Sequence, residues 1–80
     1  MKNNWNRMAA NILRAELHLR GLTYQELHHR LADLGVKEST NGIKAKINRG
    51  SFQFSFFLKC ASAIGIERLN LDSIYHTESN

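Results

Sequence analysis

Four stretches of this chain carry apolar residues three and four positions apart, and a glycine closes each stretch. Such spacing is typical of an amphipathic helix, and glycine readily takes the left-handed conformation that ends one. The chain contains no proline, so none of the expected helices is interrupted from within. We therefore expect an all-α fold without strands. The closing glycines are Gly21, Gly35, Gly50 and Gly65.

Capping residues indicate where the first two helices begin. The first is expected over residues 5–20, with an asparagine before it as the cap. The second opens on a capping box, in which Thr23 caps the helix and Glu26 follows three residues later. It ends at Gly35, which gives the two helices clear limits.

The later helices follow the same rules. The third is expected over residues 39–49, capped by Ser39 or Thr40, and the fourth covers about 54–64. An aspartate at position 72 can cap a short fifth helix that reaches Tyr75. The sequence thus predicts a bundle of four helices plus a short fifth.

The periodic apolar residues form the expected core. In the fourth helix the stripe at helical spacing leaves out Phe52 and Phe56, whereas Cys60 lies on its apolar side. The stripes consist of Trp5, Met8, Ala9, Ile12, Leu13 and Leu17; Leu27, Leu31 and Leu34; Ile43 and Ile47; and Phe54, Phe57, Leu58, Ala61 and Ile64.

The charge of the chain favours a partner that carries phosphates. Lysine and arginine number 11 against 7 acidic residues, which gives a net charge of +4. From residue 37 to 49 there are four basic residues and one acidic residue, Glu38. The length limits the chain to one domain, residues 1–80, with a core at about 5–75 and frayed ends.

Several other classes of protein are disfavoured. No apolar run approaches the ~18 residues that span a bilayer, and no signal peptide is evident, so we expect a cytoplasmic protein without membrane contact. The single cysteine excludes an internal disulfide and a cysteine-rich zinc site. His28 and His29 point about 100° apart on a helix and do not form a metal-binding pair. We expect no enzyme, metal, cofactor or small-molecule substrate.

Two capped helices joined by a glycine turn form the helix-turn-helix pattern. The stretches 22–27, 34–36 and 47–50 resemble the phage-repressor/Cro-like (Xre-type) helix-turn-helix family, and residues 54–66 resemble its fourth helix. The resemblance covers about residues 10–75. It extends to uncharacterised bacterial domains with the same Thr-Tyr-x-Glu-Leu opening and Lys-Ile-x-Arg-Gly closing. It implies a lambda-repressor-like bundle and a sequence-specific DNA-binding transcriptional regulator.

In this family the second helix of the motif lies in the major groove, and its N-terminal residues meet base edges. Ile43 and Ile47 fix the buried side of that helix, so residues half a turn away face outward. The expected base contacts are Thr40, Asn41, Lys44 and Asn48. The expected phosphate contacts are Tyr24, Gln25, Lys46, Arg49 and Ser51.

The aromatic cluster after Gly50 has two interpretations. Phe52 and Phe56 fall off the apolar stripe; they either cover the loop after Gly50 or, if exposed, mark a contact surface. In the second case they form, with Leu71 and Tyr75, a candidate surface for a homodimer or another protein.

Two alternatives to sequence-specific recognition of double-stranded DNA stay open. The first is a protein-protein adaptor that keeps the helix-turn-helix fold, since a fold does not imply a function. An open, electropositive face at Asn41, Lys44 and Asn48 favours DNA, whereas a blocked face beside exposed phenylalanines favours the adaptor. The second is a non-specific nucleic-acid binder, including an RNA binder, with strong salt dependence and little sequence preference.

Overall fold

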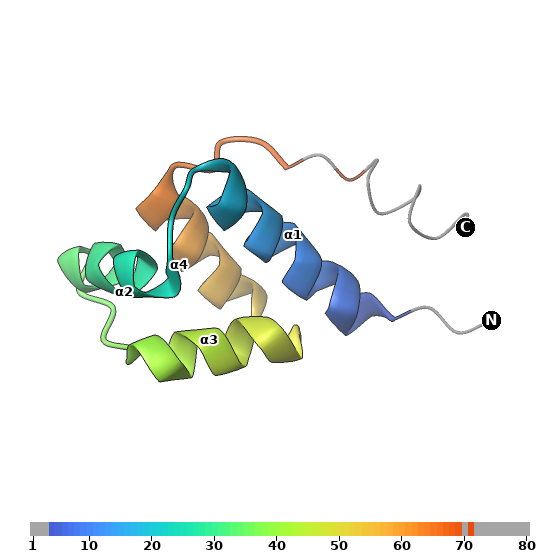
Figure 1. Cartoon of the computed structure of the whole chain (residues 1–80), viewed down its shortest axis with the longest axis horizontal. Coiled ribbons are helices and arrows are strands. Elements are labelled where there is room, and N and C mark those ends of the chain that lie inside the picture. The colour runs from blue at the N-terminus through green and yellow to red at the C-terminus, as the bar shows by residue number, and fades with distance from the viewer. Residues whose placement is uncertain (1–3, 70, 72–80) are drawn as a thin grey trace.

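The computed structural model describes residues 4–69 and residue 71, in which four helices surround one core (Figure 1). They are α1 (Trp5–Leu19), α2 (Tyr24–Asp33), α3 (Thr40–Arg49) and α4 (Phe54–Ile64). The all-α prediction and the limits of these helices are therefore confirmed for the described residues. The predicted fifth helix, residues 72–75, lies outside them.

Side-chain caps begin three of the helices where the sequence predicts. Both halves of the capping box at α2 are formed: Thr23 Oγ1 accepts from the amide of Glu26 at 3.1 Å, and Glu26 Oε1 accepts from the amide of Thr23 at 2.9 Å. The Glu26 carboxylate accepts from both the amide and the hydroxyl of Thr23, and these two hydrogen bonds lower its pKa. Asn4 and Ser39 cap α1 and α3, and the side-chain oxygen of each accepts from a backbone amide in the first turn of its helix at 2.9 Å.

The end of α3 is pressed against the start of α1. Gly50 follows α3 with φ +72°, a conformation that favours glycine. A Cβ at Gly50 would lie 1.7 Å from the backbone oxygen of Asn6, in the first turn of α1. Only glycine fits this contact, which fixes the C-terminal end of α3 in the fold.

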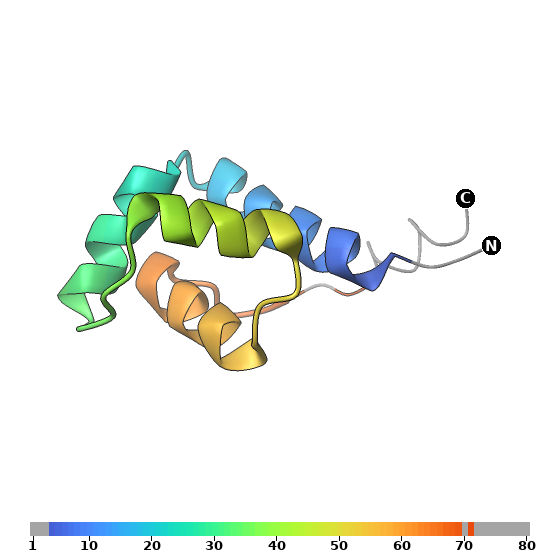
Figure 2. The same cartoon turned by 90° about the horizontal axis from the view of Figure 1, so that it is seen from below.

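The four helices pack so that α3 lies along one side of the molecule. It contacts α1 and α2, and α2 also packs against α4. Seen from below in Figure 2, α3 runs in front of the other helices. Its buried residues belong to a shared core made of Leu13, Leu17, Leu27, Leu31, Ile43, Ile47, Phe56, Cys60 and Ile64.

Arg20, which follows α1, forms a hydrogen bond with the C-terminal end of α4. Its Nε donates to the carbonyl oxygen of Ile64 at 2.9 Å, and its Nη1 pairs with Glu16 at 2.6 Å. A cation at this place complements the negative end of the α4 dipole.

Within the described residues, no helix is long and apolar enough to cross a membrane.

The inner face of α4 differs from the predicted stripe. Phe56 and Cys60 are buried, whereas Phe54 is 68% exposed and Leu58 is 52% exposed. Because α4 is apolar on most of its surface, its sequence carries two overlapping stripes, and contact with α2 selects between them. The prediction that Phe54 and Leu58 belong to the core is wrong.

Two further apolar residues were wrongly assigned to the core. Trp5 is 60% exposed in the first turn of α1, and the first buried residue of this helix is Ala10. Leu34 is half exposed because it caps the C-terminal end of α2 and lies beyond its last packed turn.

Candidate functional site

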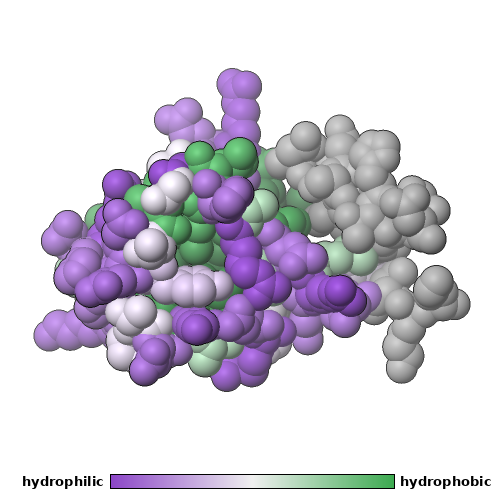
Figure 3. All heavy atoms as spheres, in the orientation of Figure 1, coloured by the Kyte–Doolittle hydropathy of each residue, from purple (hydrophilic) through white to green (hydrophobic). Residues whose placement is uncertain are grey.

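The outer face of α3 is open and polar. Ile43 and Ile47 are completely buried, and the residues opposite them, Asn41, Lys44 and Asn48, are exposed. Thr40 is half-buried at the first position of the helix. Figure 3 shows a mainly hydrophilic surface at the lower edge of the molecule, where α3 runs. Three of the four predicted base-contact residues therefore share one accessible face, with the fourth at its border.

A hollow at the N-terminus of α2 borders α3 through one residue of its wall, Arg14. It has a volume of about 440 Å³ and lies between the second half of α1 and the start of α2. Tyr24, a predicted phosphate contact, is half-buried in its wall, and the neighbouring Gln25 is exposed. The other lining residues are Arg14, Leu17, His18, Leu22 and Thr23.

Arg14 brings a cation to this border that sequence reasoning missed. Its Nη1 donates to Oδ1 of Asn48 at 2.6 Å, which joins α1 to the outer face of α3. Its position in α1 indicates only a favourable charge for the helix dipole. The contact with a residue 34 positions later depends on tertiary packing and leaves no local pattern in the sequence.

A second hollow, lined mainly by polar residues, borders α3 on the opposite side, where the chain turns from α3 into α4. Its volume is about 350 Å³. The predicted phosphate contacts Lys46, Arg49 and Ser51 all line it, together with Phe52, Gln53 and Phe56. The outer face of α3 thus lies between these two borders, and each border holds predicted phosphate contacts.

Lys46 is more constrained than its neighbours on α3. Its ammonium pairs with the carboxylate of Glu38 and lies 5.1 Å from the centre of the Phe56 ring. The carbonyl oxygen of Glu38 also accepts a hydrogen bond from Nδ1 of His28 at 2.6 Å, which ties the loop before α3 to α2. Much of the charge of Lys46 is therefore compensated inside the protein.

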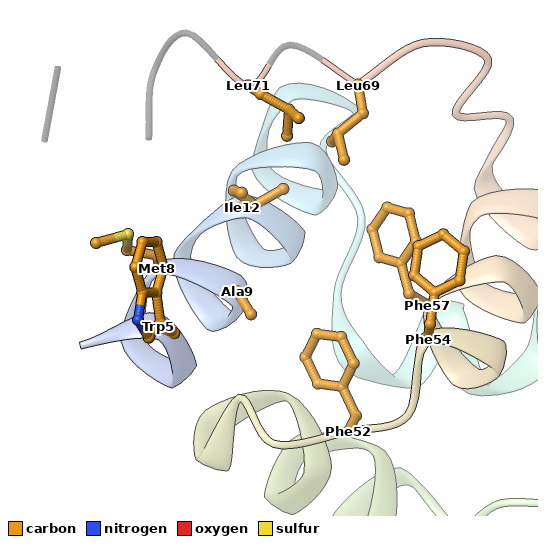
Figure 4. Close-up of a pocket in the computed structure, with 9 residues that line it drawn as sticks. All are labelled: Trp5, Met8, Ala9, Ile12, Phe52, Phe54, Phe57, Leu69 and Leu71. Carbon is orange, nitrogen blue, oxygen red and sulfur yellow. The ribbon is translucent and has the colours of Figure 1, made fainter. Parts of the chain in front are cut away.

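An apolar groove of about 280 Å³ lies between the first half of α1, the start of α4 and the segment after α4 (Figure 4). The rings of Phe54 and Phe57 stack 5.9 Å apart at one wall of this groove. Sequence reasoning missed the place of Trp5 and Phe54 here because it assigned both to the core. The groove is lined by Trp5, Met8, Ala9, Ile12, Phe52, Phe54, Phe57, Leu69 and Leu71.

The residues predicted for a partner surface do not all lie on the surface of the protein. Phe52 and Leu71 line the apolar groove. Phe56 is 6% exposed and belongs to the core, because contact with α2 turns it inward, so its assignment to a contact surface is wrong. Tyr75 lies outside the described residues.

The cysteine belongs to the core. Cys60 is fully buried, and this burial raises the pKa of its thiol to about 12. A thiol held in its protonated form is a poor nucleophile. Among the described residues, no three histidine, cysteine, aspartate or glutamate side chains gather as a metal site would require.

A family model matches residues 5–69 and is described as a domain of unknown function, DUF6471. This match covers most of the chain, so the protein belongs to the DUF6471 family. No curated protein and no solved structure matches the chain.

Proposed function

We propose that this DUF6471 protein is a cytoplasmic, sequence-specific transcriptional regulator that binds double-stranded DNA. In this proposal α2 and α3 form a helix-turn-helix of the lambda-repressor type, and α3 lies in the major groove. The observation that carries the proposal is the exposed polar face of α3, with predicted phosphate contacts on both of its borders. A recognition helix requires this arrangement, because the phosphates of both strands flank the bases that it reads.

The size and side chains of α3 suit the major groove. Ten residues give a helix about 15 Å long, and the groove is about 12 Å wide. Asn41 and Lys44 are exposed in its first half, where asparagine can read adenine and lysine can read guanine. Ala45, also exposed, lets the helix approach a thymine methyl closely.

The two borders supply phosphate contacts of different kinds. At one border, Tyr24 and Gln25 stand in the first turn of α2, where free amide groups and the helix dipole attract an anion. At the other border, Arg49 and Ser51 offer a guanidinium and a hydroxyl.

We also propose that a second copy of the chain covers the apolar groove. Trp5 and Phe54 are exposed there, and apolar patches of this kind usually mark an interface. Phe52 lines both the groove and the polar hollow beside the end of α3. A second copy seated on the groove therefore lies next to the proposed DNA surface. Dimers of this type bind half-sites about 34 Å apart.

Sedimentation of the protein alone and on DNA tests the dimer. Phe54→Glu is expected to weaken self-association. Leu19→Glu is the matched control and should leave self-association unchanged, because Leu19 is also exposed but lies at the C-terminal end of α1 and does not line the groove. A wild-type protein that stays monomeric at high concentration, both free and on DNA, contradicts this part of the proposal.

The function itself is tested by selection from a randomised duplex library at two salt concentrations. The wild type is expected to enrich a motif, and Asn41→Ala and Lys44→Ala should each degrade it at one or two positions. Binding without a motif, weakening uniformly with salt, points to a non-specific binder. Absence of binding at low salt contradicts the proposal and favours the adaptor alternative.

A further inference from the structure

Arg14 of α1 bridges asparagines on two different helices. Its Nη1 donates to Oδ1 of Asn48 on α3 at 2.6 Å, and its Nη2 donates to Oδ1 of Asn11 on α1 at 3.1 Å. Arg14 is half-buried between the helices. Hydrogen bonds from a charged guanidinium are among the stronger ones in proteins, and two of them hold its planar fork at both ends.

The chemistry of arginine fixes the direction of the Asn48 amide. A guanidinium has five N–H donors and no acceptor, so the group facing it must be an acceptor. Turning the amide over would place the Nδ2 donor of Asn48 against the donors of Arg14. The Oδ1 of Asn48 therefore faces Arg14, and because Asn48 is exposed, its Nδ2 is presented to the solvent.

A fixed amide reads DNA differently from a free one. A free asparagine accepts from N6 and donates to N7 of adenine, and so prefers that base. Arg14 occupies one lone pair of Oδ1 and holds this oxygen toward α1, so Nδ2 is the group of Asn48 that is best placed to enter the groove. Guanine presents two acceptors there, O6 and N7, whereas adenine presents a donor beside its single acceptor.

Resting on the proposed function, we propose that Arg14 is a positioning residue that makes Asn48 select guanine over adenine. Arg14 itself touches no base in this account. The pair works as a unit across the seam between α1 and α3, and it adds α1 to the elements that set the sequence preference of the protein.

Selections with the wild type, Asn48→Ala and Arg14→Met test this inference. Asn48→Ala identifies the base pair that Asn48 reads, as the position at which the preference disappears. At that position we expect the wild type to favour guanine by about fivefold, the value of one modest base contact. Arg14→Met keeps a long side chain but frees Oδ1 of Asn48, so the preference should move toward adenine.

Arg7→Met is the matched control. Arg7 lies two turns before Arg14 on the same side of α1 and is exposed, so its loss removes the same charge without touching Asn48. Weaker binding to all duplexes with an unchanged preference is expected. Side-chain amide resonances of Asn48 in the free protein should move in Arg14→Met and stay in place in Arg7→Met.

The outcomes separate this inference from the function on which it rests. A wild-type motif whose guanine preference survives in Arg14→Met overturns the inference and leaves the function intact. Uniformly weaker binding by Asn48→Ala, without loss of a base preference, places Asn48 on the phosphates and also overturns it. A wild type that enriches no motif overturns the function and the inference together. Unmoved Asn48 resonances in Arg14→Met show that the bridge is absent in solution.

Discussion

The inner and outer faces of α3 differ in how firmly their side chains are held. On the inner face, Ile43 and Ile47 are completely buried and Gly50 meets the backbone of α1. On the outer face, Asn41 and Lys44 stand in solvent. The inner face fixes the place of the helix, so the outer face is free to carry residues chosen for a ligand.

Two polar residues at the borders between these faces have partners inside the protein. Lys46 pairs with Glu38, and Asn48 accepts from Arg14. Both residues are polar, and the sequence assigns both to contacts with DNA. Their internal partners change what each can offer to a ligand: a compensated charge in the first case, and an amide of fixed direction in the second.

The largest expected effect comes from breaking the inner face at its end. Gly50→Ala places a methyl group on the backbone of Asn6 and forces a left-handed alanine, so we expect a loss of about 3 kcal/mol or more in the free energy of unfolding. Gly35→Ala is the control: its φ is +81° but the space around it is open, so a loss of only about 1–2 kcal/mol is expected. Denaturant unfolding measures both, and equal losses would contradict the packed contact at Gly50.

Breaking the outer face should affect binding and leave the fold intact. We expect Lys44→Ala to cost about 1–3 kcal/mol of DNA binding free energy, and to change the free energy of unfolding by less than about 0.5 kcal/mol. Lys59→Ala removes a lysine that is also exposed, from α4, and should bind as the wild type does. Titration of a selected duplex measures the affinities. Equal losses in the two variants would mean that the charge acts without a defined site.

The burial of Cys60 in the core predicts a loss of stability in alkali. The folded protein holds the Cys60 proton up to a pKa of about 12, whereas the unfolded chain releases it near the usual 9. Stability is therefore complete below pH 9 and falls as the pH rises toward 12. At pH 10 we expect a loss of about 1 kcal/mol from this thiol.

Unfolding of the wild type and Cys60→Ala at pH 8 and pH 10 isolates that contribution. The alanine variant is less stable at both values, because it leaves a small cavity, but it should lose less on going to pH 10. The same loss in both proteins would show that the thiol of Cys60 is accessible to water.

The smallest effect is expected from breaking the ion pair between Lys46 and Glu38. Glu38→Gln releases the ammonium of Lys46, and its half-exposed ion pair contributes less than about 1 kcal/mol to stability. DNA affinity should rise a few-fold, and the slope of log affinity against log salt should steepen by about 1. Glu67→Gln, a charge change at an exposed residue after α4, is the control. A slope that stays the same in Glu38→Gln would place Lys46 away from the phosphates.

Local chemistry made the helix limits predictable. The capping box at Thr23 and the glycine at position 50 act over a few residues, so they can be recognised along the chain. The outer face of α3 was predictable for the same reason, because Ile43 and Ile47 set its direction.

The rotation of α4 and the internal partners of the polar residues were not predictable. Phe54 and Phe56 have similar side chains two positions apart, and only packing against α2 decides which one is buried. The hydrogen bond from Arg14 to Asn48 joins residues 34 positions apart. Such contacts depend on how helices cross, which no local spacing encodes.

Methylation interference on the selected duplex tests the placement of α3 in the major groove, because it distinguishes the two grooves of DNA. Methyl groups at guanine N7 occupy the major groove, and those at adenine N3 occupy the minor groove. With α3 in the major groove, N7 methylation within the motif is expected to block binding by the wild type, and one of these positions should become tolerant in Lys44→Ala. Interference at adenine N3 alone, or at neither atom, would contradict the placement of α3 in the major groove.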